Sequence, residues 1–259
     1  MNYTNLQLEK RGHVAIVRMS NPPANTWTRD SLAALETLVA DLNADHDIRA
    51  LVLTGDGERF FSAGADLKLF ADGDLGTAAD MALRFGRAFT ALAHFRGVSI
   101  AAINGYAMGG GLEVALACDL RVAESQAVMA LPEASVGLLP CAGGTQLLPH
   151  LVGEGWAKRM VLLGERVDAA QAGRIGLVEA VVPTGQALDT ALEMAGRVER
   201  QSPSSVMACK TLLQAARTAP PETNLPLERE LFIQLFSTED QREGVRAFLD
   251  KRDPVWKNR

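Results

Sequence analysis

Ile100-Ala-Ala-Ile-Asn-Gly-Tyr-Ala-Met-Gly-Gly-Gly-Leu-Glu-Val-Ala-Leu-Ala-Cys-Asp-Leu120 combines a strand pattern, a glycine run and an apolar helix pattern. The strand is the apolar run from Val98 to Ile103, which Asn104-Gly105 ends in a turn. After the glycines, residues 112–117 are apolar on every helical face except at Glu113. We therefore expect a strand, a glycine turn and a buried helix that carries Glu113 into the interior.

A buried glutamate needs a physical reason, because a carboxylate among apolar side chains is costly unless it is paired, hydrogen-bonded or protonated. Gly109 to Gly111 indicate one, since a ligand can approach a backbone that has no Cβ. The free N–H groups and the positive end of the helix dipole would then face negative charge on that ligand. These residues predict half of an active site, and they fit a close helix–strand crossing with a hydrogen-bonded core glutamate equally well.

The composition bounds the class of protein. A chain of 259 residues with 47% hydrophobic content can bury a full core. The net charge of -5 and the pI near 5.5 argue against a general nucleic-acid or membrane-surface partner. No window has the length of a membrane span, and the first residues lack the apolar core of a signal peptide. We expect a cytoplasmic protein that binds neither nucleic acid nor membrane.

The cysteines and histidines are too few and too scattered to predict disulfides or a metal site. We expect free thiols, no metal, and satisfied or surface imidazoles. The residues concerned are Cys118, Cys141, Cys209, His13, His46, His94 and His150.

Strand and helix patterns alternate along most of the chain, which predicts a mixed α/β fold with functional loops after the strands. Strands are expected at 13–19, 48–54, 98–103, 120–123 and 127–131, and helices at 29–43, with Thr28 as the cap, and at 78–94. Residues 71–77, directly before the helix expected at 78–94, are small and polar and fit either a lid or an ordinary connection.

From about residue 202 the pattern becomes helical, with helices expected at 204–218, 225–237 and 238–251. The change in composition at 201–205 divides the chain into residues 1–200 and 201–259. Apolar side chains on the last two helices would close the core or join a neighbouring subunit; they are Phe232, Leu235, Phe236, Val245 and Phe248.

A second acid, Glu133, follows Pro132 in an apolar setting. Its local sequence fits a glutamate at a helix start, where it complements the helix dipole. Residues 142–146 then form another glycine turn that a ligand could approach closely.

Five ordered motifs resemble the crotonase superfamily, and specifically enoyl-CoA hydratase: Phe61–Leu67, Asn104–Glu113, Pro132-Glu133, Pro140–Gln146 and Glu243–Lys251. The resemblance runs nearly end to end. It implies a crotonase-like spiral of ββα units, followed by a helical region that joins subunits into trimers, usually paired into hexamers. It also implies an acyl-CoA substrate and no separate cofactor, because coenzyme A is part of that substrate.

The resemblance assigns roles to individual residues. The backbone N–H groups of Ala65 and Gly110 would form an oxyanion hole for the thioester oxygen. Glu113 and Glu133 would hold the nucleophilic water, with Glu113 as the base and Glu133 as the acid that protonates the α-carbon. Both acids are required, and their roles could be exchanged. Two close carboxylates in an apolar pocket should titrate as a coupled pair.

Coenzyme A contacts follow from the same resemblance. Backbone around the 63–67 loop and the glycine run would meet the adenine and pantetheine portions, and two C-terminal residues would reach a neighbouring subunit's nucleotide. These residues are Ala63, Gly64, Asp66, Leu67, Gly109, Phe248 and Lys251. Lys251 also fits a solvated helix residue. Three departures stand out: residues 21–25 lack the common basic residue, Cys141 replaces a common glycine, and Leu147 occupies a usual arginine position.

The implied reaction is the reversible syn-hydration of a trans-2-enoyl-CoA to a 3-hydroxyacyl-CoA. Isomerisation, a hydratase for branched or aromatic acyl groups, and a non-catalytic or RNA-binding role are the alternatives. Acyl specificity would depend on pocket depth around Trp27, Phe70, residues 71–77 and Met108.

Overall fold

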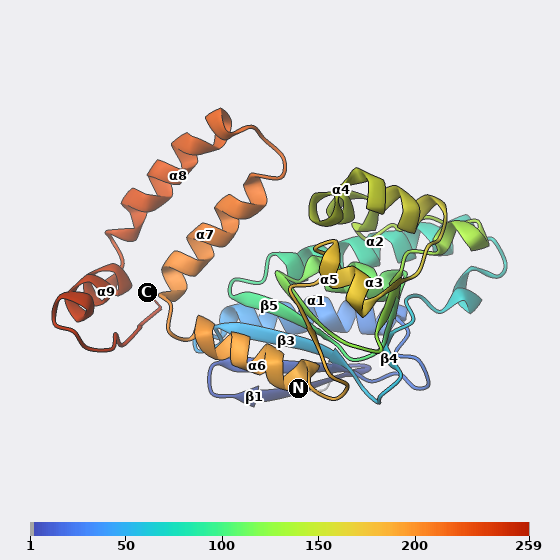
Figure 1. Ribbon diagram of the computed structural model, residues 1–259, viewed down its shortest axis with the longest axis horizontal. Helices are drawn as coiled ribbons and strands as arrows, with labels where there is room; N and C mark the ends of the chain where they lie inside the picture. The colour runs from blue at the N-terminus through green and yellow to red at the C-terminus, as the bar shows by residue number, and fades with distance from the viewer. Residues whose placement is uncertain (1–2, 259) are drawn as a thin grey trace.

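The computed structural model describes residues 3–258, which form two sheets, helices on both faces of the larger sheet, and a helical arm (Figure 1). The larger sheet has the order β1 (Leu6–Arg11), β2 (Val14–Met19), β3 (Ala50–Gly55), β5 (Val98–Ile103), β7 (Leu120–Glu124) and β10 (Ala180–Val182). The smaller sheet has the order β4 (Phe60–Ser62), β6 (Tyr106–Met108), β8 (Val128–Ala130) and β9 (Val167–Asp168). Among the strand pairs of residues 3–258, β1–β2 and β8–β9 are antiparallel and the others are parallel.

The chain repeats one unit of two strands and a helix. In each unit the first strand joins the larger sheet, the second joins the smaller sheet, and a helix follows. The units are β3, β4 and α2 (Leu75–Ala93), then β5, β6 and α3 (Gly110–Ala117), then β7, β8 and α4 (Gly144–Leu162). A short turn of 3-10 helix precedes two of these helices, namely η1 (Leu67–Phe70) and η2 (Glu133–Val136). This order confirms the expected spiral of ββα units.

Alternating side chains of the larger sheet enter two separate apolar clusters. On β2, Ala15 and Val17 belong to the cluster that includes α1 (Arg29–Ala44) and α2. Val14 and Ile16 belong to the cluster formed with α6 (Ala187–Val198), which covers the opposite face (Figure 1). Because both faces are buried, the central strands read as continuous apolar runs, which made them predictable.

Most expected elements are confirmed within a few residues, and the misses have local causes. Thr28 caps α1 through its side chain, as expected. Helix α2 begins at Leu75 rather than at residue 78, because the Asp74 side chain accepts a hydrogen bond from the Thr77 N–H and caps the helix earlier. Strand β1 was not predicted because it is a largely exposed edge strand with a polar sequence, and β6 because it has 3 residues.

The last helices, α7 (Pro203–Ala215), α8 (Pro221–Leu235) and α9 (Glu239–Leu249), extend away from the body as an arm (Figure 1). Lys210 anchors α7 to the body. Its Nζ donates to the carbonyls of Phe95 at 2.8 Å and Gly97 at 3.0 Å and to Asp119 Oδ2 at 2.7 Å. The three helices are confirmed, and the division into residues 1–200 and 201–259 stays a prediction.

The Lys210 anchor predicts a measurable loss of stability in Lys210→Met. The substitution keeps the apolar stem but leaves two carbonyls without their donor and Asp119 with only its hydrogen bonds from Ser99, so the free energy of unfolding should fall by about 2 kcal/mol. Urea denaturation measures this change. Lys158→Met, at an exposed ion pair with Glu154 on α4, is the control and should change the value by less than about 0.5 kcal/mol. An equal effect of the two substitutions would contradict the anchoring role.

Candidate functional site

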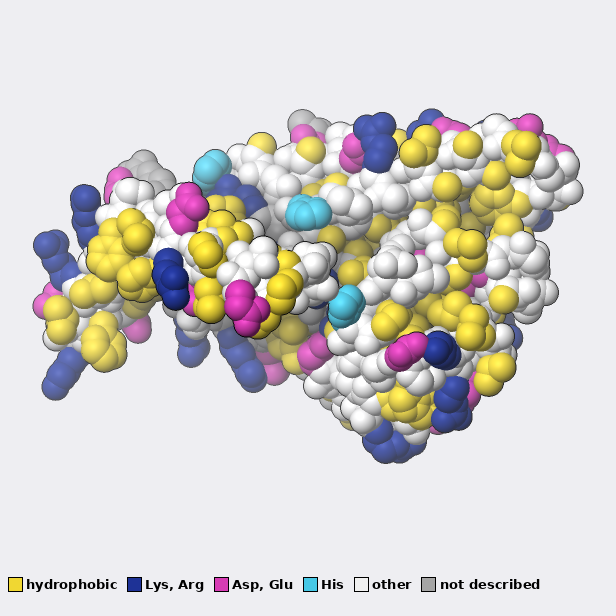
Figure 2. All heavy atoms as spheres, turned by 90° about the horizontal axis from the view of Figure 1, so that it is seen from above, with side chains coloured by type: hydrophobic (Ala, Val, Ile, Leu, Met, Phe, Trp, Pro, Cys, Tyr) yellow, Lys and Arg dark blue, Asp and Glu magenta, His cyan; other side chains and the backbone are white. Residues whose placement is uncertain are grey.

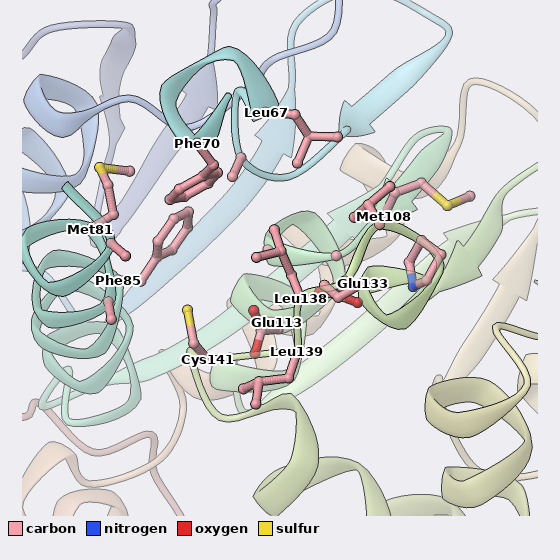
Figure 3. A pocket seen from close by; sticks show the side chains of 18 of the residues that line it. Leu67, Phe70, Met81, Phe85, Met108, Glu113, Glu133, Leu138, Leu139 and Cys141 are labelled. Atoms are coloured by element: carbon pink, nitrogen blue, oxygen red, sulfur yellow. The ribbon is translucent and has the colours of Figure 1, made fainter. Parts of the chain in front are cut away.

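A pocket of about 500 Å³ opens between η1, α2, the start of α3 and residues 132–141 (Figure 3). Its walls are largely apolar, and the labelled side chains include Phe70, Met81, Phe85, Leu138 and Leu139. Glu113 and Glu133 are its only acidic lining residues among residues 3–258. An apolar cavity with a few convergent polar groups is the usual form of a small-molecule site.

Glycines bring two backbone segments together at one end of this pocket. A Cβ at Gly64 would lie 2.6 Å from the Met108 carbonyl oxygen and 3.0 Å from the Gly110 nitrogen. A Cβ at Gly111 would lie 2.1 Å from the Ser62 carbonyl oxygen. Any side chain at these positions would therefore push the 62–65 segment away from the start of α3. The glycine run therefore allows a close backbone crossing. Such a crossing was one of the two interpretations of the run, and the approach of a ligand to the backbone was the other.

The same crossing leaves two N–H groups free beside the pocket. The Trp27 N–H donates to the Gly64 carbonyl at 2.8 Å, and the Asp66 N–H donates to the Trp27 carbonyl at 3.4 Å. This bridge uses the residues on either side of Ala65 and not the Ala65 N–H itself. Gly110 is the first residue of α3, where N–H groups lack intrahelical partners. Neither N–H donates to another residue within 3–258, and both residues line the pocket.

Glu113 is buried, as expected, with 2% of its surface exposed. Its Oε1 accepts hydrogen bonds from the Ala142 N–H at 2.8 Å and the Gly144 N–H at 2.9 Å. Burial raises the pKa of Glu113, and these two hydrogen bonds act in the opposite direction because they stabilise the carboxylate. The glycine turn at residues 142–146 thus holds Glu113 in place.

Glu133 is the first residue of η2, as its helix-start interpretation predicted. Its Oε2 is buried and has no hydrogen-bond partner among residues 3–258. Burial, with a smaller contribution from the charge of Glu113, raises the pKa of Glu133 to about 7, although the backbone N–H of Glu133 itself acts in the opposite direction. Figure 3 shows both acids in the middle of the pocket, where they approach from α3 and η2. A carboxyl poised near neutral pH with an unpaired oxygen is suited to proton transfer.

The segment 63–67 alternates between pocket lining and structural support. Ala63, Ala65 and Leu67 line the pocket. Gly64 packs against α3, and the Asp66 side chain accepts a hydrogen bond from the Lys68 N–H and caps η1. Gly109 lines the pocket too, and a Cβ there would lie 3.0 Å from Glu133 Oε1.

Two residues assigned to coenzyme A lie elsewhere in this chain. Phe248 is 83% exposed on α9, and Lys251 follows that helix. Neither lines the pocket, so their contact with a neighbouring subunit's nucleotide stays a prediction.

Two expectations about pocket depth were wrong. Trp27 is 2% exposed and packs edge-on against Phe89 in the core, and it does not line the pocket. Residues 71–77 do not line it either; their last three residues form the first turn of α2, which lines the pocket only from Ala78 onward. Phe70 and Met108 do line the pocket, as expected.

Sequence reasoning missed the wall that α2 contributes. Ala78, Met81, Ala82 and Phe85 line the pocket from one face of that helix. Their helical spacing was visible in the sequence, but the same spacing describes any helix face packed on a core. Leu138 and Leu139, exposed by 41% and 67%, were also missed as lining residues. Of the three departures from the family pattern, Cys141 lines the pocket beside Glu113 (Figure 3), whereas Leu147 lies on α4 and does not line it.

All three cysteines are free, as expected. The described part of the chain contains no group of three or more His, Cys, Asp and Glu side chains that could hold a metal ion. None of its helices combines the length and the apolar character needed to cross a membrane.

Known proteins resemble this chain along its length. Residues 9–259 match the family model described as enoyl-CoA hydratase/isomerase. The chain is 40% identical to 2,3-dehydroadipyl-CoA hydratase of Escherichia coli, over 98% of this chain and 99% of that protein. It is 36% identical to short-chain-enoyl-CoA hydratase of Clostridium acetobutylicum, over 97% of each.

Solved structures show the same relationship. DspI of Pseudomonas aeruginosa has 64% sequence identity and a TM-score of 0.96, over 98% of this chain and 97% of that chain. An enoyl-CoA hydratase from Bacillus anthracis has 33% sequence identity and a TM-score of 0.94, over 98% of this chain and 100% of that chain.

The raised pKa of Glu133 predicts a pH-dependent stability. Between the ordinary value of 4.5 and about 7, native Glu133 retains a proton that the unfolded chain has released. Stability should therefore fall as pH rises through this window and level off above it. The stability of the Glu133→Gln variant, measured by urea denaturation, should fall less steeply across the same pH window. The exposed Glu193→Gln should follow the wild type, and parallel curves for wild type and Glu133→Gln would contradict the prediction.

Proposed function

This chain belongs to the enoyl-CoA hydratase/isomerase family, and we propose that it adds water reversibly to a trans-2-enoyl-CoA to give a 3-hydroxyacyl-CoA. One observation carries the proposal: two acids and two unpaired backbone N–H groups line a single apolar pocket. The names of the hydratase relatives support the same class of reaction.

The two N–H groups are suited to charge that develops on the thioester oxygen. When water adds to the β-carbon, the electrons of the double bond move toward the thioester and leave an enolate. Donors from Ala65 and Gly110, the latter at a helix N-terminus, stabilise that enolate more than the neutral carbonyl. Losing one such donor typically raises a barrier by about 2.7–4 kcal/mol.

The environments of the two acids favour distinct roles. Glu113 accepts two backbone hydrogen bonds on one oxygen, which favours its carboxylate and suits it to take a proton from water. Glu133 has a pKa of about 7 and an unpaired buried oxygen, which suits it to deliver a proton to the α-carbon. After one hydration Glu113 is protonated and Glu133 ionised, so a proton must pass between them or through solvent before the next turnover.

The pair of acids also favours hydration over isomerisation. A double-bond shift moves one proton between carbons and needs no activated water, so a single acid–base residue suffices. Here a second carboxylate, that of Glu113, is held in the same pocket by the backbone of residues 142–144, although burying a carboxylate costs free energy. Isomerisation remains a side activity that Glu133 could support.

For the assembly, we propose a trimer or a pair of trimers in the cytoplasm. The arm carries a cluster of exposed apolar side chains (Figure 2), with Phe232 and Ile233 on α8, Phe236 directly after it, and Val245, Phe248 and Leu249 on α9. Apolar side chains gathered in this way favour burial against another subunit. In such an assembly Phe248 and Lys251 would be presented to a neighbour's nucleotide.

Removing either carboxylate should abolish most of the proposed activity. Glu113→Gln and Glu133→Gln should each lower the turnover of crotonyl-CoA at least about 100-fold, the lower scale for general acid–base catalysis. Binding of a saturated acyl-CoA should persist, because the amide preserves the shape of the pocket. Glu193→Gln on α6 is the control, with turnover near wild type. Near-normal turnover in either pocket variant would refute the assignment.

Charge on the apolar arm should prevent assembly. The double variant Phe232→Asp with Phe236→Asp should give a smaller particle than the wild type by light scattering, because ionised carboxylates resist burial in an interface. Leu162→Asp on α4, at a residue outside the arm that is 66% exposed, is the matched control and should assemble normally. A monomeric wild type, or an unchanged double variant, would reject this face as the interface.

A further inference from the structure

A second cavity of about 590 Å³ adjoins the pocket at Cys141. Cys141 lines both spaces. Helix α2 also runs along both, because Met81 and Phe85 line the first while Phe89 and Ala93 line the second. A chain that enters at Gly110, passes Glu113 and continues past Cys141 would therefore reach the second cavity along a single helix face.

Gly86 lines the second cavity directly after Phe85, which lines the pocket, and no described residue packs against the place of its Cβ. No heavy atom of residues 3–258 lies within 4 Å of the place where its Cβ would be. Gly86 lines the second cavity, and its φ is not in the left-handed region. A mid-helix glycine is costly relative to alanine, and neither a tight crossing nor a turn requires this one. Its effect is to leave space.

The two ends of the second cavity differ in character. Near Cys141 its walls include Phe89 and Leu147, which are apolar. At the arm they include His94, His150 and Arg217, and no acidic residue within 3–258 lines the cavity. The position of this end is defined, because Gln214 Nε2 donates to the Ala93 carbonyl at 2.8 Å and holds the end of α7 against α2.

We propose that the second cavity receives the distal end of the acyl group, that Gly86 keeps the passage open, and that Arg217 favours acyl groups ending in a carboxylate. The proposal rests on the acyl-CoA activity proposed above and adds a substrate class to it. A guanidinium pairs with a carboxylate through directed hydrogen bonds, and the imidazoles of His94 and His150, which line the same cavity, supply further donors. The apolar section near Cys141 would hold the methylene chain.

Gly86→Leu tests the passage. The added side chain should lower kcat/KM for dodecenoyl-CoA at least about 10-fold, the scale for filling space that a substrate occupies, and leave crotonyl-CoA near wild type. Gly196→Leu is the matched control, because a Cβ at Gly196 on α6 also meets no described atom within 4 Å. An unchanged ratio of long-chain to short-chain activity in Gly86→Leu overturns the proposal.

Arg217→Met tests the selectivity for charge. With two enoyl-CoAs of equal length, the variant should lose about 3-fold in kcat/KM for the substrate ending in a carboxylate, the scale of an exposed ion pair. The kcat/KM for the substrate ending in a methyl group should be unaffected. The control Arg197→Met on α6 should change kcat/KM for neither substrate. An equal effect on both substrates, or none on either, overturns the assignment of Arg217.

Binding of saturated acyl-CoAs separates this proposal from the proposed function, because it needs no turnover. By calorimetry, Gly86→Leu should weaken lauroyl-CoA binding at least about 10-fold and leave butyryl-CoA unchanged. If the wild type binds in this manner but hydrates no enoyl-CoA, the proposed function fails and the cavity assignment stands. If it hydrates crotonyl-CoA and neither assay depends on Gly86, the cavity assignment alone fails.

Discussion

The site depends on the backbone contact between residues 62–65 and the start of α3. Gly64 lies against the Met108 carbonyl and the Gly110 nitrogen, and Gly111 lies against the Ser62 carbonyl. These contacts admit no Cβ, so the two segments approach more closely than side chains would allow. The approach brings the free N–H groups of Ala65 and Gly110 to one pocket, although the two residues lie on different ββα units.

Around this crossing the fold creates an electrostatic asymmetry between two similar side chains. Burial raises the pKa of both glutamates, but only Glu113 has two backbone N–H groups directed at one carboxylate oxygen. Glu133 keeps an oxygen without a partner among residues 3–258. Two identical residue types thus have different hydrogen bonding in one pocket, which is what distinct acid and base roles require.

Helix α2 and the arm extend the site beyond the reacting groups. One face of α2 lines the pocket and then the second cavity, and the Lys210 and Gln214 hydrogen bonds hold α7 at the far end. The C-terminal helices therefore do more in this structure than present an apolar surface to a partner. They place a cationic side chain, Arg217, where the end of a long acyl chain would lie.

The sequence by itself determined the ββα alternation, the buried Glu113 and the helical C-terminus, because apolar periodicity and glycine positions are local properties that survive folding. It also named both acids and both N–H groups, through motifs whose order was readable. Only the tertiary structure decided that Trp27 is core rather than pocket wall, that Asp74 starts α2 early, and that a second cavity lies beyond Cys141. Whether a helix face meets a core or a cavity depends on what packs against it, and residues distant in the chain supply that packing.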